Sequence, residues 1–326
     1  MQNNAALNQN FLSLRSHLEQ VIVGQNDLLD RLLISLLTGG HILLESLPGL
    51  AKTTAVTTLA SGVHASFQRI QFTPDLLPGD LTGSEIYDAQ SGSFRFVPGP
   101  IFNEIVLADE INRAPPKVQS ALLEAMQERQ VTAGGETRKL TELFIVMATQ
   151  NPLEQSGTYP LPEAQLDRFL LHVVLDYPDP DDELLILQRD RSIQQQPQKQ
   201  AMDSESPLHP DQVLQARKAV SNIHVSEVLE KYIIQLVGAT RHLEQLDEGW
   251  KDYLQAGASP RASIALLRAS SALAYLRGRD YVVPDDIIDI APDVLRHRLV
   301  LGYAARAAEI DANNIISRVL AEVSIP

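Results

Sequence analysis

Several residues suited to phosphate chemistry follow directly on a short apolar segment of this chain. The run Ile42 to Leu44 leads into ESLPGLAKTTAVTTLA, where Gly49, Lys52 and Thr53 stand at the expected turn from a strand into a helix. Backbone N–H groups of such a turn and the positive end of the following helix can bind phosphates. Lys52 can reach the terminal phosphates, and the Thr53 hydroxyl can ligate Mg²⁺. The segment therefore predicts a phosphate-binding loop.

This loop departs from the strict pattern GxxxxGK[ST] at both glycine positions. Ser46 stands where the first glycine is usual, and Ala51 stands where the second is usual. We expect Ala51 to need no special backbone angle at a helix start, whereas Ser46 would weaken nucleotide binding if its position requires a positive φ. A Pro-Gly turn that caps an ordinary helix is the alternative interpretation. The predicted nucleotide contacts are Ser46, Leu47, Pro48, Gly49, Leu50, Ala51, Lys52, Thr53 and Thr54.

Two adjacent carboxylates form the second candidate site. The segment IVLADE places Asp109 and Glu110 at the end of a fully apolar stretch. Asp109 can hold the Mg²⁺ shell, while Glu110, one residue further, can orient and activate an attacking water. An acidic strand end without a catalytic role is the alternative, but the preceding loop favours hydrolysis. Together the motifs predict a site for ATP and Mg²⁺, with Thr53 and Asp109 as metal ligands and Glu110 as a catalytic residue.

The elements that must position these residues alternate between helix and strand. After a polar N-terminal tail, leucines recur at helical spacing from Leu28 to Leu37, and Gly39 and Gly40 end this pattern. Short β-type runs follow, several of them apolar throughout, as in strands covered on both faces. This rhythm predicts an α/β fold with a parallel sheet of about five strands and helices on each side. The runs are 42–44, 67–72, 105–108, 143–148 and 170–175.

The second part of the chain has a different organisation. Residues 188–210 lose apolar periodicity and gain Gln, Ser and Pro, which predicts a linker. We therefore expect an α/β nucleotide-binding core at residues 1–187, a linker at 188–210 and a smaller all-helical lid domain at 211–326. The helical patterns of the lid cover about 211–221, 226–241, 263–276, 284–298 and 304–323.

Composition narrows the classes of function. The 326 residues include 27 Lys and Arg against 41 Asp and Glu, and this net charge of −14 argues against nucleic acid or an anionic membrane as the default partner. The absence of cysteine excludes disulfide scaffolds, thiolate zinc sites and cysteine nucleophiles. No apolar run approaches the ~18 residues that span a bilayer, and the N-terminus has no cationic start. We expect a cytoplasmic protein without membrane insertion.

Three long segments resemble the MoxR family of AAA+ ATPases. They are LADEINRAPPKVQSALLEAMQERQVT, ATQNPLEQSGTYPLPEAQLDRFLL and GASPRASIALLRAS, and the similarity extends from Val23 to the last helices. The resemblance implies a homo-oligomeric, usually hexameric, ring with a chaperone-like activity. It also implies client or adaptor proteins, which in this family often carry a von Willebrand A domain.

The resemblance further implies roles for single residues. Asn151 in TQNP matches sensor 1, which contacts the γ-phosphate or the attacking water. Arg168 in LDRF resembles the arginine finger supplied to a neighbour's nucleotide, and Arg261 in SPRAS resembles sensor 2 on the lid. Judged alone, each arginine reads as a surface salt-bridge partner, and Asn151 reads as a turn residue before proline. The segment that resembles the adenine contact is Val23, Gly24 and Gln25.

Two turn-rich segments match the helix-2-insert clade of these ATPases. The first is TPDLLPGDLTGSEIYDAQSGSFRFVPGP, residues 73–100. The second, QVTAGGETRKLTEL at 130–143, predicts two short strands around a Gly-Gly turn. In relatives such hairpins face the central pore and can contact a substrate, while a stabilising surface hairpin is the alternative.

The leading interpretation is an ATP-driven remodeller that acts on partner proteins. A DNA-directed AAA+ motor is one alternative, but no helix-turn-helix or zinc module is evident, and the Gly134-Gly135 tip has only Arg138 and Lys139 nearby. A magnesium-chelatase-like ATPase subunit shares the same core. An ATP-binding scaffold without turnover is the non-enzyme alternative, and Ser46 is its only support.

Overall fold

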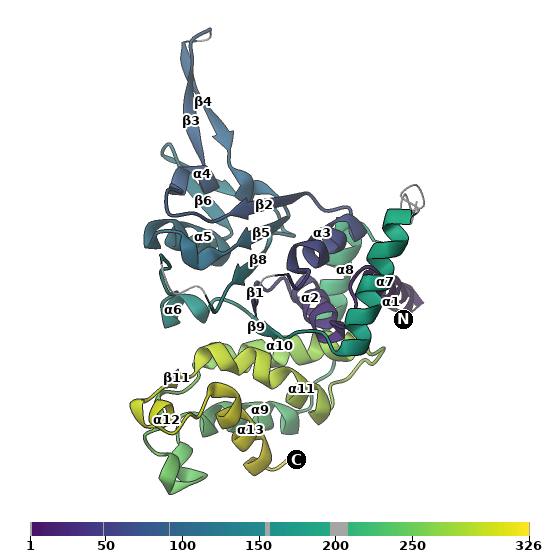
Figure 1. Ribbon diagram of the computed structural model, residues 1–326, viewed down its shortest axis with the longest axis vertical. Coiled ribbons are helices and arrows are strands. Elements are labelled where there is room, and N and C mark those ends of the chain that lie inside the picture. Colours follow the sequence, from purple (N-terminus) through teal and green to yellow (C-terminus); the bar gives the residue numbers. More distant parts are fainter. Residues whose placement is uncertain (1, 48, 91, 154–156, 196–207, 326) are drawn as a thin grey trace.

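A five-stranded parallel sheet forms the centre of the structure (Figure 1). The strand order is β2-β5-β8-β1-β9, so strands far apart in the sequence lie side by side, and the expected parallel sheet is confirmed. The computed structural model describes residues 2–47, 49–90, 92–153, 157–195 and 208–325. The strands of the sheet are β1 (Ile42–Ser46), β2 (Phe67–Gln71), β5 (Ile105–Asp109), β8 (Ile145–Gln150) and β9 (Leu171–Leu175).

Both faces of the central strands are buried, which explains their continuous apolar sequences. In β1, Ile42 and Leu44 belong to one hydrophobic cluster, whereas Leu43 belongs to the other. Successive side chains of a strand point to opposite faces, so a strand covered on both sides needs apolar residues throughout. The covering helices are α2 (Asn26–Thr38) and α3 (Lys52–Gly62) on the first face and α5 (Pro116–Glu128) on the second.

The N-terminal segment is a helix, α1 (Gln2–Val21), and the prediction of a polar tail is wrong. Phe11, Leu14 and Leu18 are fully buried at spacings of three and four residues, as on one face of a helix. They pack against α2 and α3, where a side chain at Gly62 would lie 2.4 Å from Leu14. The prediction failed because these few apolar residues stand among many polar ones.

The predicted linker also begins too early. Helix α7 (Pro180–Gln195) continues through the first residues of the 188–210 segment. Three acidic residues in its first turn favour this start, because they face the positive end of the helix. Residues 196–207 lie outside the described part of the chain. The next helix, α8 (Pro210–Val220), packs against α1 and α2, so the first predicted lid helix contacts the α/β core.

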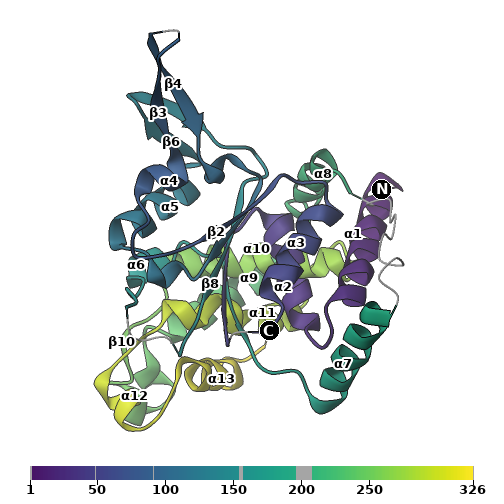
Figure 2. The same cartoon turned by 45° about the horizontal axis from the view of Figure 1, so that its top comes forward.

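Most of the remaining helices form a separate layer below the sheet in Figure 1, and they lie partly behind the strands in the turned view of Figure 2. The predicted helix at 304–323 is in fact two helices, because Glu309 has a positive φ of 56° and Asp311 caps the second helix by accepting the N–H of Asn314. Among the described residues, no helix is both long and apolar enough to cross a bilayer. This layer contains α9 (Glu227–Ala239), α10 (Pro260–Leu276), α11 (Pro284–Leu295), α12 (Tyr303–Ala307), α13 (Ala312–Glu322) and the strand pair β10 (Leu254–Ala256) and β11 (Val300–Leu301).

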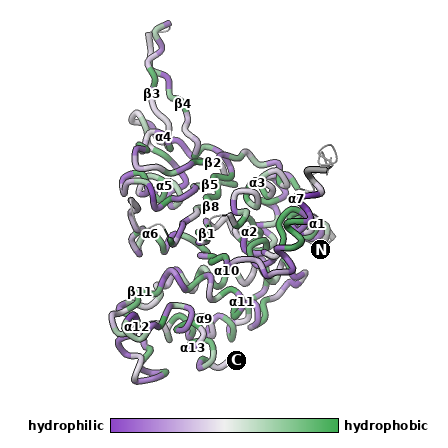
Figure 3. The backbone as a smooth tube through the Cα atoms, viewed as in Figure 1, coloured by the Kyte–Doolittle hydropathy of each residue, from purple (hydrophilic) through white to green (hydrophobic). Residues whose placement is uncertain are grey.

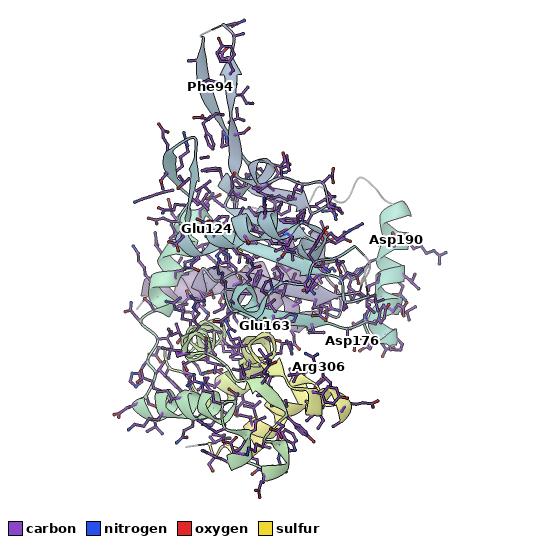
Figure 4. The ribbon with its side chains drawn as sticks, turned by 90° about the vertical axis from the view of Figure 1, so that its left-hand side faces the viewer. Phe94, Glu124, Glu163, Asp176, Asp190 and Arg306 are labelled. Carbon is purple, nitrogen blue, oxygen red and sulfur yellow. The ribbon has the colours of Figure 1, made fainter. Side chains whose placement is uncertain are left out.

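Two hairpins extend from the opposite end of the molecule. The insert at 73–100 contains α4 (Pro78–Thr82) and a projecting pair of strands, β3 (Gly83–Asp88) and β4 (Ser93–Pro98). Hydrophobic and hydrophilic residues alternate along this hairpin (Figure 3), and Phe94 lies near its tip (Figure 4). The predicted second hairpin is confirmed as β6 (Gln130–Ala133) and β7 (Glu136–Lys139).

The turn between β1 and α3 has its unusual backbone at Ala51 and not at Ser46. Ala51 has a φ of 51° and a ψ of 19°, a left-handed conformation immediately before α3. Ser46 is absent from the residues with positive φ and ends β1 as an ordinary strand residue. The expectation that Ala51 needs no special backbone angle is therefore wrong. Ser46 was expected to weaken nucleotide binding only if its position required a positive φ, and it does not have one.

We predict that Ala51→Gly and Ser46→Gly have opposite effects on stability. A left-handed conformation costs an alanine roughly 1–2 kcal/mol, which glycine avoids. A glycine inside a strand costs about 0.5–1 kcal/mol through backbone entropy. In urea denaturation, the free energy of unfolding should be higher for Ala51→Gly than for Ser46→Gly by about 1.5–3 kcal/mol. Equal values, or a less stable Ala51→Gly chain, would contradict this assignment of strain.

Candidate functional site

The phosphate-binding loop, the acidic pair and Asn151 meet at one edge of the sheet. Strands β5, β8 and β1 are neighbours and all run in the same direction, so their carboxyl ends share an edge. The loop that begins at Ser46 follows β1, Asp109 ends β5, and Asn151 follows β8. Open α/β sheets bind their ligands at this edge. The structure thus brings together the phosphate-binding loop and the acidic pair, which are far apart in the sequence.

Lys52 lies between the loop and the acidic pair. Its ammonium donates a hydrogen bond to the carbonyl oxygen of Ser46 at 3.3 Å. Burial lowers the pKa of Lys52, while the charges of Asp109 and Glu110 act in the opposite direction. The lysine is therefore close enough to both carboxylates to feel their charge. A bound phosphate would favour the charged ammonium further, since opposite charges attract strongly at a partly buried site.

Asp109 is buried, and both of its carboxylate oxygens accept hydrogen bonds. Thr149 donates its hydroxyl to Oδ1 at 2.6 Å. Arg69 on β2 donates Nε and an Nη to Oδ2 at 3.0 and 2.6 Å. The Arg69 guanidinium is thus a cation bound to the carboxylate that we expected to coordinate Mg²⁺. Oxygen ligands such as Asp109 and the Thr53 hydroxyl suit this metal, so the residues present fit it.

Glu110 is held in a defined position beside Asp109. Its backbone has a positive φ of 57°, and its N–H donates to the Thr149 hydroxyl at 2.9 Å. Its carboxylate Oε2 accepts hydrogen bonds from Gln71 at 2.8 Å and from Arg113 at 2.9 Å. Thr149 therefore joins the two acidic residues, and neighbouring side chains fix the carboxylate of the second.

Sequence reasoning missed these supporting residues, although one signal was present. Arg69 and Gln71 are two positions apart on β2, so their side chains share a face of the strand. Gln71 is in register with Asp109, which brings that face to the acidic pair. A polar residue repeated at a spacing of two, in a strand beside a catalytic strand, could have indicated them. Thr149 carried no comparable signal, because its role depends on the pairing of β5 with β8.

Asn151 makes the turn that the alternative interpretation described. Its Oδ1 accepts the N–H of Leu153 at 3.1 Å, and its side chain is buried. The side-chain NH₂ group makes no hydrogen bond within the described part of the chain. The turn thus orients the amide without using its donors, so the two interpretations of this residue are compatible.

A cavity of about 920 Å³ lies beside the loop. It is lined by Val23 and Gln25 together with Gly49, Leu50 and Ala51, so the predicted adenine segment and the loop share one space. Gln25 also donates a hydrogen bond to the carbonyl of Asp176 at 3.1 Å. A volume of this size suits a nucleotide. Of the other predicted contacts, Gly24 has a positive φ of 70°, Leu47 is half-buried, Thr54 is exposed and Pro48 lies outside the described residues.

Arg168 and Arg261 lie at the opposite edge of the sheet. Leu171 pairs with Ile42 at the start of β1, so Arg168 lies near the amino ends of these strands. The phosphate-binding loop follows the carboxyl end of β1. A five-residue strand spans roughly 16 Å. The Arg261 guanidinium is 3.7 Å from the Asp167 carboxylate and therefore lies beside Arg168. The structure does not bring these two arginines to the loop of their own chain.

Asp167 joins this pair of arginines to the helical layer. Its Oδ1 accepts a hydrogen bond from Arg298 at 2.8 Å, and its Oδ2 accepts one from the Ser259 hydroxyl at 3.0 Å. Ser259 is the N-cap of α10, the helix that carries Arg261. Nε of Arg168 is buried without an acceptor in the described residues. Within the described residues, Nε of Arg168 is therefore available as a hydrogen-bond donor.

Known proteins resemble this chain along most of its length. Residues 41–171 match the ATPase family associated with various cellular activities (AAA), and residues 250–319 match the AAA lid domain. The chain is 48% identical to Chaperone MoxR1 of Mycobacterium tuberculosis over 309 residues, which cover 94% of this chain and 80% of that protein. It is 32% identical to Protein MoxR of Paracoccus denitrificans, with 97% of this chain and 96% of that protein covered.

A solved structure supports the same relationship. The crystal structure of an ATPase candidate from Cytophaga hutchinsonii superposes with a TM-score of 0.90 at 45% identity, and the match covers 100% of this chain and 97% of that one. The shared fold, the site at the carboxyl edge of the sheet and the similarity over nearly the whole length agree with one another. The chain belongs to the MoxR family of AAA+ ATPases.

Proposed function

We propose that this protein hydrolyses ATP with Mg²⁺ and uses the energy to remodel or mature partner proteins. The convergence of Lys52, Asp109 and Glu110 is the observation that carries the proposal, together with the 920 Å³ cavity that the preceding loop residues line. A cation, two carboxylates and a nucleotide-sized space are the parts that phosphoryl transfer requires. The relative named as a chaperone supports a protein client. By family resemblance, that client or its adaptor carries a von Willebrand A domain.

Each residue of the site has a specific task in this proposal. Lys52 binds the terminal phosphates, and Thr53 and Asp109 hold Mg²⁺, which neutralises charge on the phosphates. Glu110 orients and polarises the attacking water, and Asn151 directs its free amide N–H groups at the γ-phosphate. Gln71 and Arg113 donate hydrogen bonds to the Glu110 carboxylate and so hold it in position.

The two distant arginines complete the site of a neighbouring subunit. Arg168 and Arg261 share the edge of the sheet that faces away from their own loop. A homo-oligomeric ring, hexameric by family resemblance and located in the cytoplasm, would present both to the next nucleotide. The scaffold alternative loses its only support, because Ser46 has no positive φ. The net charge of −14 does not favour the DNA-directed alternative.

We predict different defects for Lys52→Ala and Glu110→Gln. Loss of the lysine removes a charge-assisted hydrogen bond, so affinity for a fluorescent ATP analogue should fall about 10- to 100-fold. Glu110→Gln should keep that affinity while turnover falls about 10²- to 10⁴-fold, because an amide cannot act as a base. Glu124→Gln, on the exposed face of α5, is the matched control (Figure 4). Wild-type turnover in Glu110→Gln would transfer the catalytic role elsewhere.

We also predict that two inactive variants restore activity when mixed. Lys52→Ala retains Arg168, and Arg168→Ala retains the loop, so a mixed interface can contain one intact site. An arginine supplied in trans can contribute about 10³- to 10⁵-fold in rate. Phosphate release should therefore recover partially on mixing. Mixing Lys52→Ala with the Lys52→Ala/Arg168→Ala double variant should restore nothing. Proven mixed oligomers without any recovery would return Arg168 to a structural role.

A further inference from the structure

A second cavity, of about 560 Å³, lies between the helical layer and the core. Its walls come from the end of α2, the end of α8, the following loop and the middle of α10. It shares no lining residue with the nucleotide cavity in the described part of the chain. Leu37 and Thr38 line the second cavity at the C-terminal end of α2. Val23 and Gln25, which line the nucleotide cavity, precede the N-terminal end of the same helix. The function proposed above does not use this cavity.

Two arginines converge on a single carbonyl group at this cavity. Arg217 from α8 donates one Nη to the carbonyl of Glu142 at 2.9 Å and Nε to the carbonyl of Leu36 at 2.9 Å. Arg129 donates to the same Glu142 carbonyl at 3.1 Å and to the carbonyl of Gly39 at 2.8 Å. Two guanidinium groups that share one acceptor lie close together, and their like charges repel.

No carboxylate forms a salt bridge with either arginine in the described residues. The second Nη of Arg217 is buried and has no acceptor there. Burial, together with the charge of Arg129, lowers the pKa of Arg217 to about 10, although the charge of the Glu142 carboxylate acts in the opposite direction. Burial and the charge of Arg268 lower the pKa of Arg129 as well. A half-buried cation that lies beside another cation and forms no salt bridge is costly, and in a chain with 41 acidic residues it requires an explanation.

Capping of α2 explains only part of this arrangement. The Leu36 and Gly39 carbonyls lie at the negative end of that helix, where cations are stabilising. Capping leaves the free Nη of Arg217 unexplained, and it gives no role to Arg268, which lines the cavity from α10. An anion bound between Arg217 and Arg268 would accept a hydrogen bond from this Nη and would pair with the charge of Arg268.

The rest of the lining suits a small molecule with one charged end. Ser221, Asn222 and His224 add polar groups, while Ile223 and Leu267 add apolar surface. Glu230 is the one acidic side chain among the described lining residues, and it makes no salt bridge with either arginine. The volume exceeds that of a bare anion and lies within the range of small-molecule sites, roughly 300–1,000 Å³.

We propose that this cavity binds a phosphate-bearing small molecule, with the phosphate between Arg217 and Arg268. Several arginines without carboxylate partners match the charge and the many acceptor oxygens of a phosphate group. Because Arg217 belongs to α8 beside the core and Arg268 to α10, the ligand would join the two layers of the molecule. The site is separate from ATP hydrolysis and does not depend on the function proposed above.

The test measures binding of inorganic phosphate and of AMP by calorimetry to the full-length Lys52→Ala chain, whose nucleotide site is impaired. Adding Arg268→Ala should weaken the binding of both about 10- to 100-fold, since a charge-assisted hydrogen bond is lost. Arg268 is exposed, so this variant should fold, and circular dichroism checks that it does. Arg268→Lys, which keeps the charge, should retain more affinity than Arg268→Ala.

Arg306→Ala is the matched control, because it removes the same charge from an exposed position of the helical layer outside the cavity (Figure 4). It should leave both affinities unchanged. Tighter binding of AMP than of phosphate would identify an organic phosphate as the ligand, and equal binding would identify free phosphate. Both results support the site. Equal affinities in the Arg268→Ala and Arg306→Ala chains, or no binding to the Lys52→Ala chain, would overturn the proposal.

Discussion

The pairing of β1 between β8 and β9 is the constraint on which the rest of the structure depends. Burial of β1 on both faces fixes its register, since a shift by one residue would exchange the side chains of the two hydrophobic clusters. That register sets Lys52 at the carboxyl edge of the sheet and Arg168 at the amino edge. One packing requirement therefore separates the groups proposed to bind ATP from the groups proposed to complete hydrolysis in a neighbour.

Each carboxylate of the acidic pair forms a salt bridge within the chain. Arg69 pairs with Asp109, and Arg113 pairs with Glu110. Both contacts use a carboxylate that the proposed reaction requires. These contacts link the site to β2, which carries Arg69, and to the segment after β5, which carries Arg113.

Much of the fold and of the site could be predicted from the sequence because the relevant signals are local. Short β-type runs, several of them apolar throughout, indicated the five strands, and the residues between Gly49 and Thr53 indicated the loop. Other features depend on tertiary contacts. The helix of Phe11, Leu14 and Leu18 gains its stability from packing on α2 and α3. The left-handed backbone of Ala51 was missed because an alanine stands there, although the usual glycine of the pattern GxxxxGK[ST] at this position is a signal for it.

The partners of the acidic pair were equally out of reach, since Thr149 contacts Asp109 only when β5 and β8 pair. The placement of Arg261 also needed the structure, because it depends on how α10 docks through Ser259 and Asp167. Sequence reasoning thus located the groups that act within one chain better than it located those that lie between layers.

The central claim is that a single chain holds only part of the hydrolytic site. The most direct test measures phosphate release per chain over a dilution series, while mass photometry records the fraction of assembled protein at each concentration. We expect phosphate release per chain to rise with concentration in parallel with the assembled fraction, and to fall about 10³-fold or more in the monomer. A dilute monomer that hydrolyses ATP at the full rate would contradict it.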